Sequence, residues 1–369
     1  MKKRKAVPFF MNKNRRFLSA LALALFFAGY PSGLLQAQTS PTEMESIFDY
    51  LSKGGEVVEL SLKTDMDELI NNRRRAEYQA AELSYTDAGG GETVWEVGVL
   101  PRGRYRRRIC DFPPIRLNFS KGQLEERGVN PEYDKMKVVA HCLEEKDKES
   151  LVLKEYLTYL LYNQLSPNSY RVQLARITYL DTKEKFDKIR RYGILIEETD
   201  ELAHRLGGTE FETMGQTADS VATAEENIMA VFQYMIGNED WDIRMLRNVK
   251  LIRPDDGGRL IPVPYDFDFS GFVDTPYAVA NSKLGLSNVE QRIFLGHAVE
   301  EEQLQKTLEH FRQHRSYLVS IIKNFKLLNG LERRKAIHYI ESFYEMESQL
   351  ARENEKKRKE KAENSAQNE

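Results

Sequence analysis

The sequence predicts an α+β protein built in two parts, a β-rich N-terminal part with one main helix and a mostly helical C-terminal part. Three observations support this. Short apolar runs of strand length, separated by turn residues, concentrate between residues 57 and 197. Longer segments with apolar residues at helical spacing concentrate after residue 200. One pair of strand-like runs, at 249–252 and 260–263, interrupts the helical part.

The chain opens with the three parts of a secretory signal peptide. Seven Lys or Arg residues lie within residues 1–16, an apolar run covers 17–28, and residues 35–37 resemble a cleavage site. Residues 11–37 would suffice alone, so Met1 and Met11 are both suitable starts. We expect residues 1–37 to be removed and the rest to be exported, to the periplasm or beyond. No later segment reaches the ~20 apolar residues that span a bilayer.

Removing the signal peptide makes the protein acidic. Residues 1–37 hold seven basic residues and no acid, so their loss takes the net charge from −3 to −10. An acidic protein is a poor general binder of nucleic acid. The expected partner is therefore an unidentified protein or small-molecule substrate.

The β-rich part is expected to cover residues 38–199. Its helices are expected at 44–51, 64–74 and 150–165, and its strands at 57–62, 77–85, 93–100, 113–119, 135–140, 170–179 and 192–197. The main helix is 150–165, where Leu153, Leu157 and Leu161 follow the helical period. Gly89, Gly90 and Gly91 join two strands, as a hairpin turn or as a loop whose N–H groups cradle phosphate.

Residues 102–108 contain five arginines. Forked guanidinium groups suit contact with phosphate or with an acidic substrate. The alternative is a solvated strand face that pairs with acidic side chains.

The two cysteines, Cys110 and Cys142, each lie at the edge of an expected strand. An oxidising compartment permits a disulfide between them, and two buried free thiols are the alternative. Apart from His310 and His314, which are four positions apart, the histidines are scattered, and no Cys-x-x-Cys motif for a transition metal occurs.

The helical part is expected to cover residues 200–350. Helices are expected at 200–206, 220–236, 291–295, 300–325 and 332–350. Residues 351–369 are almost wholly charged or polar, so they form a solvated helix end or a disordered tail.

An acidic stretch at 237–271 carries the strongest chemical signal. The apolar runs at 249–252 and 260–263 flank a Pro-Asp-Asp-Gly-Gly turn, which predicts a β-hairpin. Its two ends would bring Asp240 and Asn248 close to Asp266 and Asp268. Carboxylate and amide oxygens suit Mg²⁺ or Mn²⁺, and this combination is typical of phosphoryl transfer.

This stretch resembles the core of the spore-coat-protein-H (CotH) kinase family and, more distantly, the HipA-type kinases. Both have a G-N-x-D loop, a following Asn and a strand pair that ends in an aromatic-D-x-D motif. The resemblance implies a two-lobed atypical protein-kinase-like fold that binds ATP with Mg²⁺ or Mn²⁺. Asp240 would then be catalytic, Asn248 and Asp266 would bind metal, and Asp268 would be a further metal ligand.

The resemblance extends weakly to the β-rich part, where this family has a lysine-bearing strand after an R-G motif. Here that strand, at 113–119, carries Arg116 and no lysine. Arg116, Arg106 or Lys137 would instead bind the nucleotide phosphates. Glu155 on the main helix would pair with such a cation, and the backbone near 196–199 would contact adenine.

Three functions stay open at this point. The first is an exported phosphotransferase that acts on a protein or small hydroxyl substrate. The second is a catalytically inactive kinase-fold protein that serves as a binding or scaffold module of the cell envelope. The third is a metal-dependent hydrolase, in which the acids hold metal for attack by water.

Overall fold

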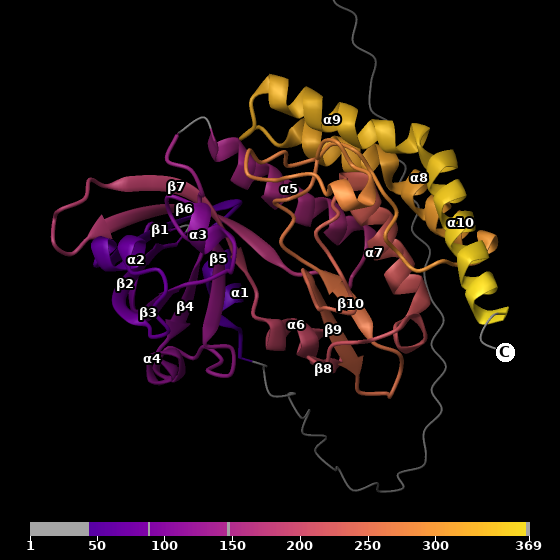
Figure 1. Ribbon diagram of the computed structural model, residues 1–369. Coiled ribbons are helices and arrows are strands. Elements are labelled where there is room, and N and C mark those ends of the chain that lie inside the picture. The colour runs from indigo at the N-terminus through magenta and orange to yellow at the C-terminus, as the bar shows by residue number, and fades with distance from the viewer. Residues whose placement is uncertain (1–43, 88, 146–147, 367–369) are drawn as a thin grey trace, which may run out of the picture. The chain divides into compact units, whose positions relative to one another are not determined.

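Seven strands close into a β-barrel in the computed structural model, which describes residues 44–87, 89–145 and 148–366 (Figure 1). The strands are β1 (Val57–Thr64), β2 (Gln79–Thr86), β3 (Glu92–Pro101), β4 (Ile115–Phe119), β5 (Lys135–Val139), β6 (Val172–Asp181) and β7 (Ile189–Ile196). They follow the order β1-β2-β3-β4-β5-β7-β6. The barrel closes because β1 pairs in parallel with β6, with Val57 opposite Leu174 and Thr64 opposite Asp181.

Alternation along each strand explains the barrel core. Along β1, Val58, Leu60 and Leu62 are buried while Glu59 between them is exposed. Trp95 from β3 is fully buried in the same cluster. Because successive side chains of a strand point to opposite faces, every second residue reaches the interior.

The predicted two-lobed kinase-like fold is wrong. The N-terminal part is a closed barrel, and it is accompanied by several helices rather than one. These helices are α1 (Ile47–Ser52), α2 (Met66–Asn71), α3 (Arg106–Ile109), α4 (Lys121–Glu126) and α5 (Glu149–Leu165). The strand positions were predicted nearly correctly, but an alternating strand has the same pattern in an open sheet and in a barrel. Only the pairing of β1 with β6, which lie far apart in the chain, distinguishes the two.

The rest of the described chain combines a small sheet with helices. Its elements are α6 (Thr199–Arg205), β8 (Gly208–Glu210), η2 (Ala218–Ser220), α7 (Thr223–Ile236), β9 (Val249–Pro254), β10 (Ile261–Pro264), η3 (Ser282–Leu284), α8 (Glu301–Asn324), α9 (Gly330–Glu345) and α10 (Glu347–Ala366). The sheet has the order β10-β9-β8. The helix expected at 291–295 does not form, and the one expected at 332–350 divides between α9 and α10.

Helix α10 runs through most of the segment 351–369, which was expected to be a solvated helix end or a disordered tail, and the helical alternative therefore holds up to Ala366. Asn354 is buried there, and its Nδ2 donates to the carbonyl of Val299 at 2.8 Å. The backbone N–H of Val299 donates in return to Oδ1 of Asn354 at 3.0 Å. This polar pair anchors α10 to the segment that precedes α8.

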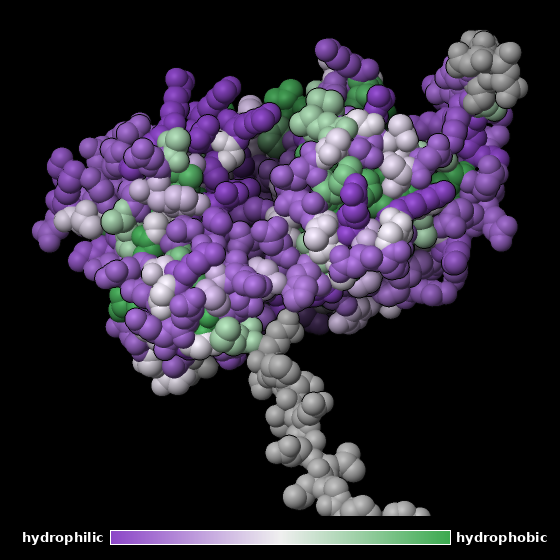
Figure 2. Space-filling model, turned by 90° about the horizontal axis from the view of Figure 1, so that it is seen from below, coloured by the Kyte–Doolittle hydropathy of each residue, from purple (hydrophilic) through white to green (hydrophobic). Residues whose placement is uncertain are grey.

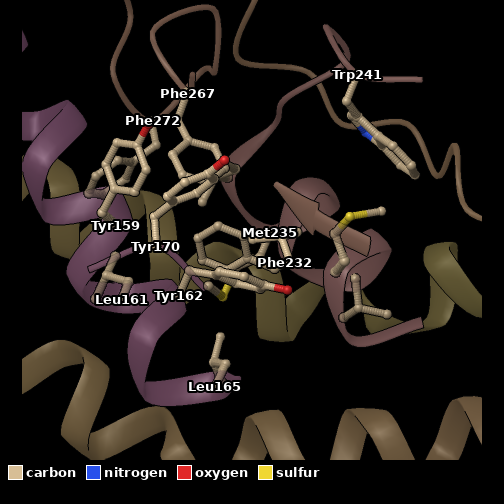
Figure 3. Close-up of a cluster of buried hydrophobic side chains, with 14 of the residues drawn as sticks. Tyr159, Leu161, Tyr162, Leu165, Tyr170, Phe232, Met235, Trp241, Phe267 and Phe272 are labelled. Atoms are coloured by element: carbon tan, nitrogen blue, oxygen red, sulfur yellow. The ribbon is translucent and has the colours of Figure 1, made fainter. Parts of the chain in front are cut away.

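An aromatic cluster joins α5 to α7 (Figure 3). Tyr162 of α5 lies 4.8 Å from Phe232 of α7, measured between ring centroids. Tyr159 lies 4.8 Å from Phe267 in the same way. Phe267 is fully buried and stands between Asp266 and Asp268 in the chain. Core packing therefore holds the backbone that carries both carboxylates.

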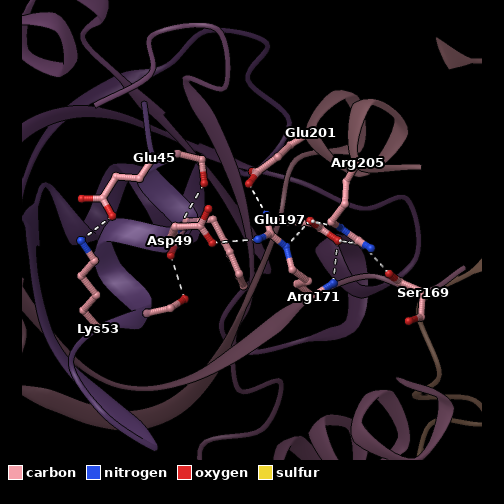
Figure 4. A network of polar contacts seen from close by, with 11 residues as sticks. Glu45, Asp49, Lys53, Ser169, Arg171, Glu197, Glu201 and Arg205 are labelled. Carbon is pink, nitrogen blue, oxygen red and sulfur yellow. Dashed lines mark hydrogen bonds and ion pairs between the residues drawn. The ribbon is translucent and has the colours of Figure 1, made fainter. Parts of the chain in front are cut away.

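A polar network ties the barrel to α6 (Figure 4). The fully buried Glu197, directly after β7, accepts hydrogen bonds from Arg171 at 2.7 Å and from Arg205 of α6 at 2.6 Å. Arg171 also donates to Asp49 of α1 at 2.8 Å. The two guanidinium groups compensate the buried charge of Glu197, as burial of a carboxylate requires.

The predicted disulfide between Cys110 and Cys142 is confirmed. It joins the residue after α3 to the segment after β5, and both cysteines are buried.

The face in Figure 2 is mostly hydrophilic, with hydrophobic residues in small separate areas. Within residues 44–366, gaps excepted, each helix is too short or too polar to span a bilayer. The expected signal peptide, residues 1–37, lies outside the described residues.

Candidate functional site

The predicted hairpin is confirmed, and its open end gathers the polar residues. β9 and β10 pair antiparallel, with Pro264 opposite Val249. One step further, the N–H of Tyr265 donates to the carbonyl of Asn248 at 3.0 Å. Asp266, the next residue, therefore lies beside Asn248, as the sequence predicted.

The end of α7 brings Asp240 to the same place. Helix α7 ends at Gly237, whose φ of +63° is a left-handed conformation that suits glycine. Beyond it, the N–H of Asp240 donates to Oδ1 of Asn238 at 3.0 Å. The Nδ2 of Asn248 donates to the carbonyl oxygen of Asp240 at 2.7 Å and to its Oδ2 at 2.9 Å. Asp240 and Asn248 are thus in direct contact.

Two of the gathered residues have a sparsely populated backbone conformation. Asn248 has a φ of +52° and Asp266 a φ of +63°. Asn and Asp tolerate this left-handed region better than other non-glycine residues. Such conformations cost about 1–3 kcal/mol each and cluster at functional sites. Their occurrence on both sides of the hairpin's open end supports a functional interpretation.

Arg106 is the central cation of an acidic cluster. It is buried, and its Nη2 donates to the carbonyl of Ala140 at 3.0 Å. Three carboxylates surround its guanidinium: Glu155 at 3.4 Å, Asp268 at 3.6 Å and Asp266 at 3.9 Å. The cluster therefore contains more acids than cations.

This excess of acid changes how the buried carboxyls titrate. Burial, reinforced by the neighbouring Asp266 and opposed by Arg106, raises the pKa of Asp268 to about 7. Burial also raises the pKa of Glu155 to about 8, with Arg106 opposing the shift. Burial raises the pKa of Asp240 as well, and Asp266 adds to that shift. The carboxyls of Asp240, Asp266 and Asp268 therefore lie close enough to act on one another.

A cationic pocket adjoins the acidic cluster. It has a volume of about 240 Å³ and lies between the barrel strands β4 and β5 and the segments 198–212 and 250–265. Its cations are Arg102, Arg116, Lys135, Lys137 and Lys250, and its acids are Glu198, Asp200, Glu210 and Glu212. Tyr265, which precedes Asp266, forms one wall. The pocket and the acidic cluster thus meet at two consecutive residues.

Lys137 is a pocket cation whose surroundings oppose its positive charge. Its Nζ donates to Oγ1 of Thr199 at 2.9 Å and lies 5.2 Å from the ring centroid of Tyr170. Burial, followed by the charges of Arg102, Lys250 and Arg116, lowers the pKa of Lys137 to about 7. Arg116 lies directly opposite Lys137 on the paired strands β4 and β5.

No protein-family model matches this chain, and no curated protein matches it in sequence. The resemblance to the CotH kinase family therefore stays a prediction.

The structure brings the predicted residues together in two groups. Asp240, Asn248 and Asp266 form the open end of the hairpin. Arg116 and Lys137 line the pocket. The remaining two, Glu155 and Asp268, are buried beside Arg106 and not beside Arg116 or Lys137.

The pocket also contains cations that sequence reasoning missed, notably Arg102 and Lys250. Nothing in the sequence distinguished Arg102 from the other arginines of 102–108. Arg106, which was expected to bind nucleotide phosphates, is instead buried among carboxylates. The segment also forms the short helix α3 instead of the expected strand face.

The structure also decides between the two alternatives for the glycine turn. Oδ1 of Asp87 accepts hydrogen bonds from the N–H groups of Gly89 and Gly91, both at 2.8 Å. Those donors already have an anionic partner, so the glycine turn is a hairpin turn stabilised by its own aspartate.

The oxygen atoms of the predicted metal ligands differ in how available they are to a cation. Within the described residues, no three His, Cys, Asp or Glu side chains form a metal-binding group. Asp266 is partly exposed. The Asn248 side chain makes its two hydrogen bonds through Nδ2, so its Oδ1 is available as a ligand. Asp268 is buried and accepts a hydrogen bond from the hydroxyl of Tyr277 at 2.8 Å. The oxygens of Asp266 and Asn248 therefore fit a hard cation better than those of Asp268.

Proposed function

We propose that this protein is an exported, divalent-metal-dependent phosphotransferase that uses a donor such as ATP and modifies a hydroxyl group of a protein or small molecule. One observation carries the proposal. Oxygen ligands at the hairpin end directly adjoin a pocket of arginines and lysines, with Tyr265 in the pocket wall and Asp266 in the acidic cluster. Metal-bound phosphates need both kinds of group side by side.

Each group has a role in this proposal. Mg²⁺ or Mn²⁺ would be held by the carboxylate of Asp266 and Oδ1 of Asn248, and it would neutralise charge on the donor phosphates. Arg102, Arg116 and Lys137 would bind the phosphates from the other side. Asp240 would orient the acceptor hydroxyl and receive its proton, a task for which a raised pKa is suitable.

The disulfide and the absence of a membrane-spanning helix among the described residues are compatible with export. The signal-peptide pattern of residues 1–37 supports it from the sequence.

Isothermal titration calorimetry with ATP, with Mg²⁺ and with both tests the binding step. We expect ATP to bind only when the metal is present. Asp266→Asn keeps a residue that tolerates positive φ but removes the charge, so it should weaken metal-dependent binding about tenfold or more. Asp255→Asn, an exposed change at the far turn of the same hairpin, is the matched control and should bind as the wild type does.

Two results of this titration would contradict the proposal. ATP binding that is equally strong without metal, or unaffected by Asp266→Asn, would remove the metal assignment. Absence of binding under all conditions would remove the proposal of a nucleotide-dependent function.

A second candidate is a binding protein that holds the same ligand without transferring phosphate. The observation in its favour is that both carboxylate oxygens of Asp240 already have partners, Arg247 at 3.3 Å and Asn248 at 2.9 Å. Turnover of γ-labelled ATP distinguishes the two. A phosphotransferase should lose about 10²–10⁴-fold of its turnover in Asp240→Asn while metal-dependent binding persists. Wild-type turnover no faster than that of Asp240→Asn would favour the binding protein.

A further inference from the structure

The cationic pocket is small and charged, which bears on what part of a donor it recognises. Its volume is about 240 Å³. Pockets for drug-sized ligands are usually 300–1,000 Å³ and mostly apolar. Among the residues that line this pocket, only Met136 and Tyr265 offer an apolar or aromatic surface. The other lining residues are five cations, four acids and Thr199, so the lining offers more partners to phosphate groups than to a purine ring.

Some of the pocket cations are already neutralised, and others are not. Lys250 pairs with Glu210, and Lys135 pairs with Asp134 at 3.2 Å. Arg102 and Arg116 make no ion pair with any described residue, although both line the pocket. Two guanidinium groups are thus available for an anion at the barrel side of the pocket.

The cations continue beyond the pocket. Arg104, Arg107 and Arg108 follow Arg102 in the chain, lie partly or fully at the surface and make no ion pair with a described residue. The ring of Tyr105 packs against that of Phe269, with 5.4 Å between centroids. This contact keeps the segment beside the residues that follow Asp266 and Asp268. We call residues 102–108 the arginine segment.

We propose that the pocket and the arginine segment together bind a linear chain of phosphates, and that the phosphate donor is inorganic polyphosphate. The inference rests on the proposed phosphotransferase function and names its donor. A phosphate chain presents a charge at every unit and has no base, which matches a pocket and a neighbouring segment whose arginines lack ion pairs with described residues.

The reaction balances without a further reactant. The acceptor hydroxyl oxygen forms a bond to the terminal phosphorus of the chain. The phosphoanhydride bond of that phosphorus breaks, and a chain shorter by one phosphate leaves. The hydroxyl proton passes to Asp240 and then to solvent.

The test measures the affinities of the purified protein, with Mg²⁺ present, for tripolyphosphate, long-chain polyphosphate, ATP and polyglutamate. Two variants separate the contribution of the pocket from that of the arginine segment. Arg102→Ala/Arg116→Ala removes the two pocket arginines, and Arg104→Ala/Arg107→Ala/Arg108→Ala removes the arginines of the arginine segment that lie outside the pocket and the acidic cluster. Arg352→Ala/Lys356→Ala/Lys359→Ala, on α10, makes the same charge change elsewhere and is the control.

We expect long-chain polyphosphate to bind about tenfold or more tightly than ATP. The pocket variant should weaken binding of both tripolyphosphate and the long chain. The arginine-segment variant should weaken the affinity for the long chain by about tenfold and change the affinity for tripolyphosphate by no more than about twofold. The α10 control should change neither.

The outcomes separate this inference from the proposed function. Metal-dependent binding of ATP that is tighter than that of tripolyphosphate overturns the polyphosphate donor but leaves the phosphotransferase in place. Polyglutamate that binds as tightly as long-chain polyphosphate shows a site for an acidic peptide, and also overturns it. Failure of ATP and both phosphate chains to bind removes the inference together with the proposed function.

Discussion

At the scale of the residue, the character of the site follows from which charges are buried together. Arg106 is buried with Glu155 and Asp268, while Arg104 and Arg108 of the same segment are exposed. Burial raises the pKa of Glu155 to about 8 and that of Asp268 to about 7, because one guanidinium does not offset the cost of burying these carboxylates together. Lys137 shows the opposite case, since burial, followed by the charges of Arg102, Lys250 and Arg116, lowers its pKa to about 7.

Lys137 leads to a prediction about pH and stability. Its pKa is about 7 in the folded protein and returns to 10.5 when the chain unfolds. Between these values the unfolded chain binds more protons, so the stability that depends on Lys137 rises with pH across that window. Below about pH 7 the destabilisation by charged Lys137 is complete. Lys137→Met removes it, so the variant should gain most over the wild type at low pH, and the gain should shrink as pH rises from about 7 to 10.5.

Urea denaturation at about pH 6, 8 and 10 measures this difference in unfolding free energy. Lys121→Met, an exposed change in α4, is the control and should show a difference that does not vary with pH. A difference independent of pH in Lys137→Met as well would mean that Lys137 keeps its charge throughout.

At the scale of the element, the short helix α3 depends on what holds it. It has four residues and is followed by Cys110, whose disulfide partner Cys142 follows the strand β5. Ala140, between β5 and Cys142, supplies a carbonyl that accepts a hydrogen bond from Arg106. An isolated helix of this length is not stable in water. The disulfide and the buried contacts of Arg106 are therefore what keep α3 in place.

Removing the disulfide should have a measurable cost. The two cysteines are 32 residues apart in the chain. Closing a loop of that size lowers the entropy of the unfolded chain by an amount worth about 3–4 kcal/mol. We expect Cys110→Ser/Cys142→Ser to lose this much unfolding free energy in a urea titration. Reductant should lower the stability of the wild type and leave the double variant unchanged, and a loss below about 1 kcal/mol would contradict the prediction.

At the scale of the whole molecule, the two hydrophobic cores share strands. Along β7, Ile194 and Ile196 belong to the core around α5 and α7, while Leu195 between them belongs to the barrel core. In β6, Leu174 and Ala175 divide in the same way. Neither core can lose its structure without exposing the other face of the same strands.

This sharing predicts that both cores unfold in one transition. The two tryptophans report on different cores, because Trp95 lies in the barrel core and Trp241 in the other. Trp241→Phe and Trp95→Phe each leave one fluorescent probe. Their urea transitions should have midpoints that coincide with the circular-dichroism midpoint measured on the same variant. Distinct midpoints for fluorescence and circular dichroism within one variant would show that the cores unfold separately.

The sequence by itself determined the local elements and part of the site. The hairpin, α5, α7 and most strands were predictable because their periodicity and turn residues lie within the segments themselves. For the same reason, Asp240, Asn248 and Asp266 could be grouped, since one hairpin and its flanks carry all three. The disulfide also followed from two cysteines at neighbouring strand edges.

Only the tertiary structure decided the barrel and the burial of Arg106. Closure depends on β1 meeting β6, and the pocket joins Arg102, Arg116 and Lys250 from separate segments. Such contacts depend on which distant surfaces bury one another, and a local pattern does not specify this. Of the five arginines at 102–108, the sequence suggested Arg106 as a phosphate-binding cation, but α3, the disulfide and three carboxylates enclose it. The charge of that one side chain is stabilised by groups that only the folded chain brings together.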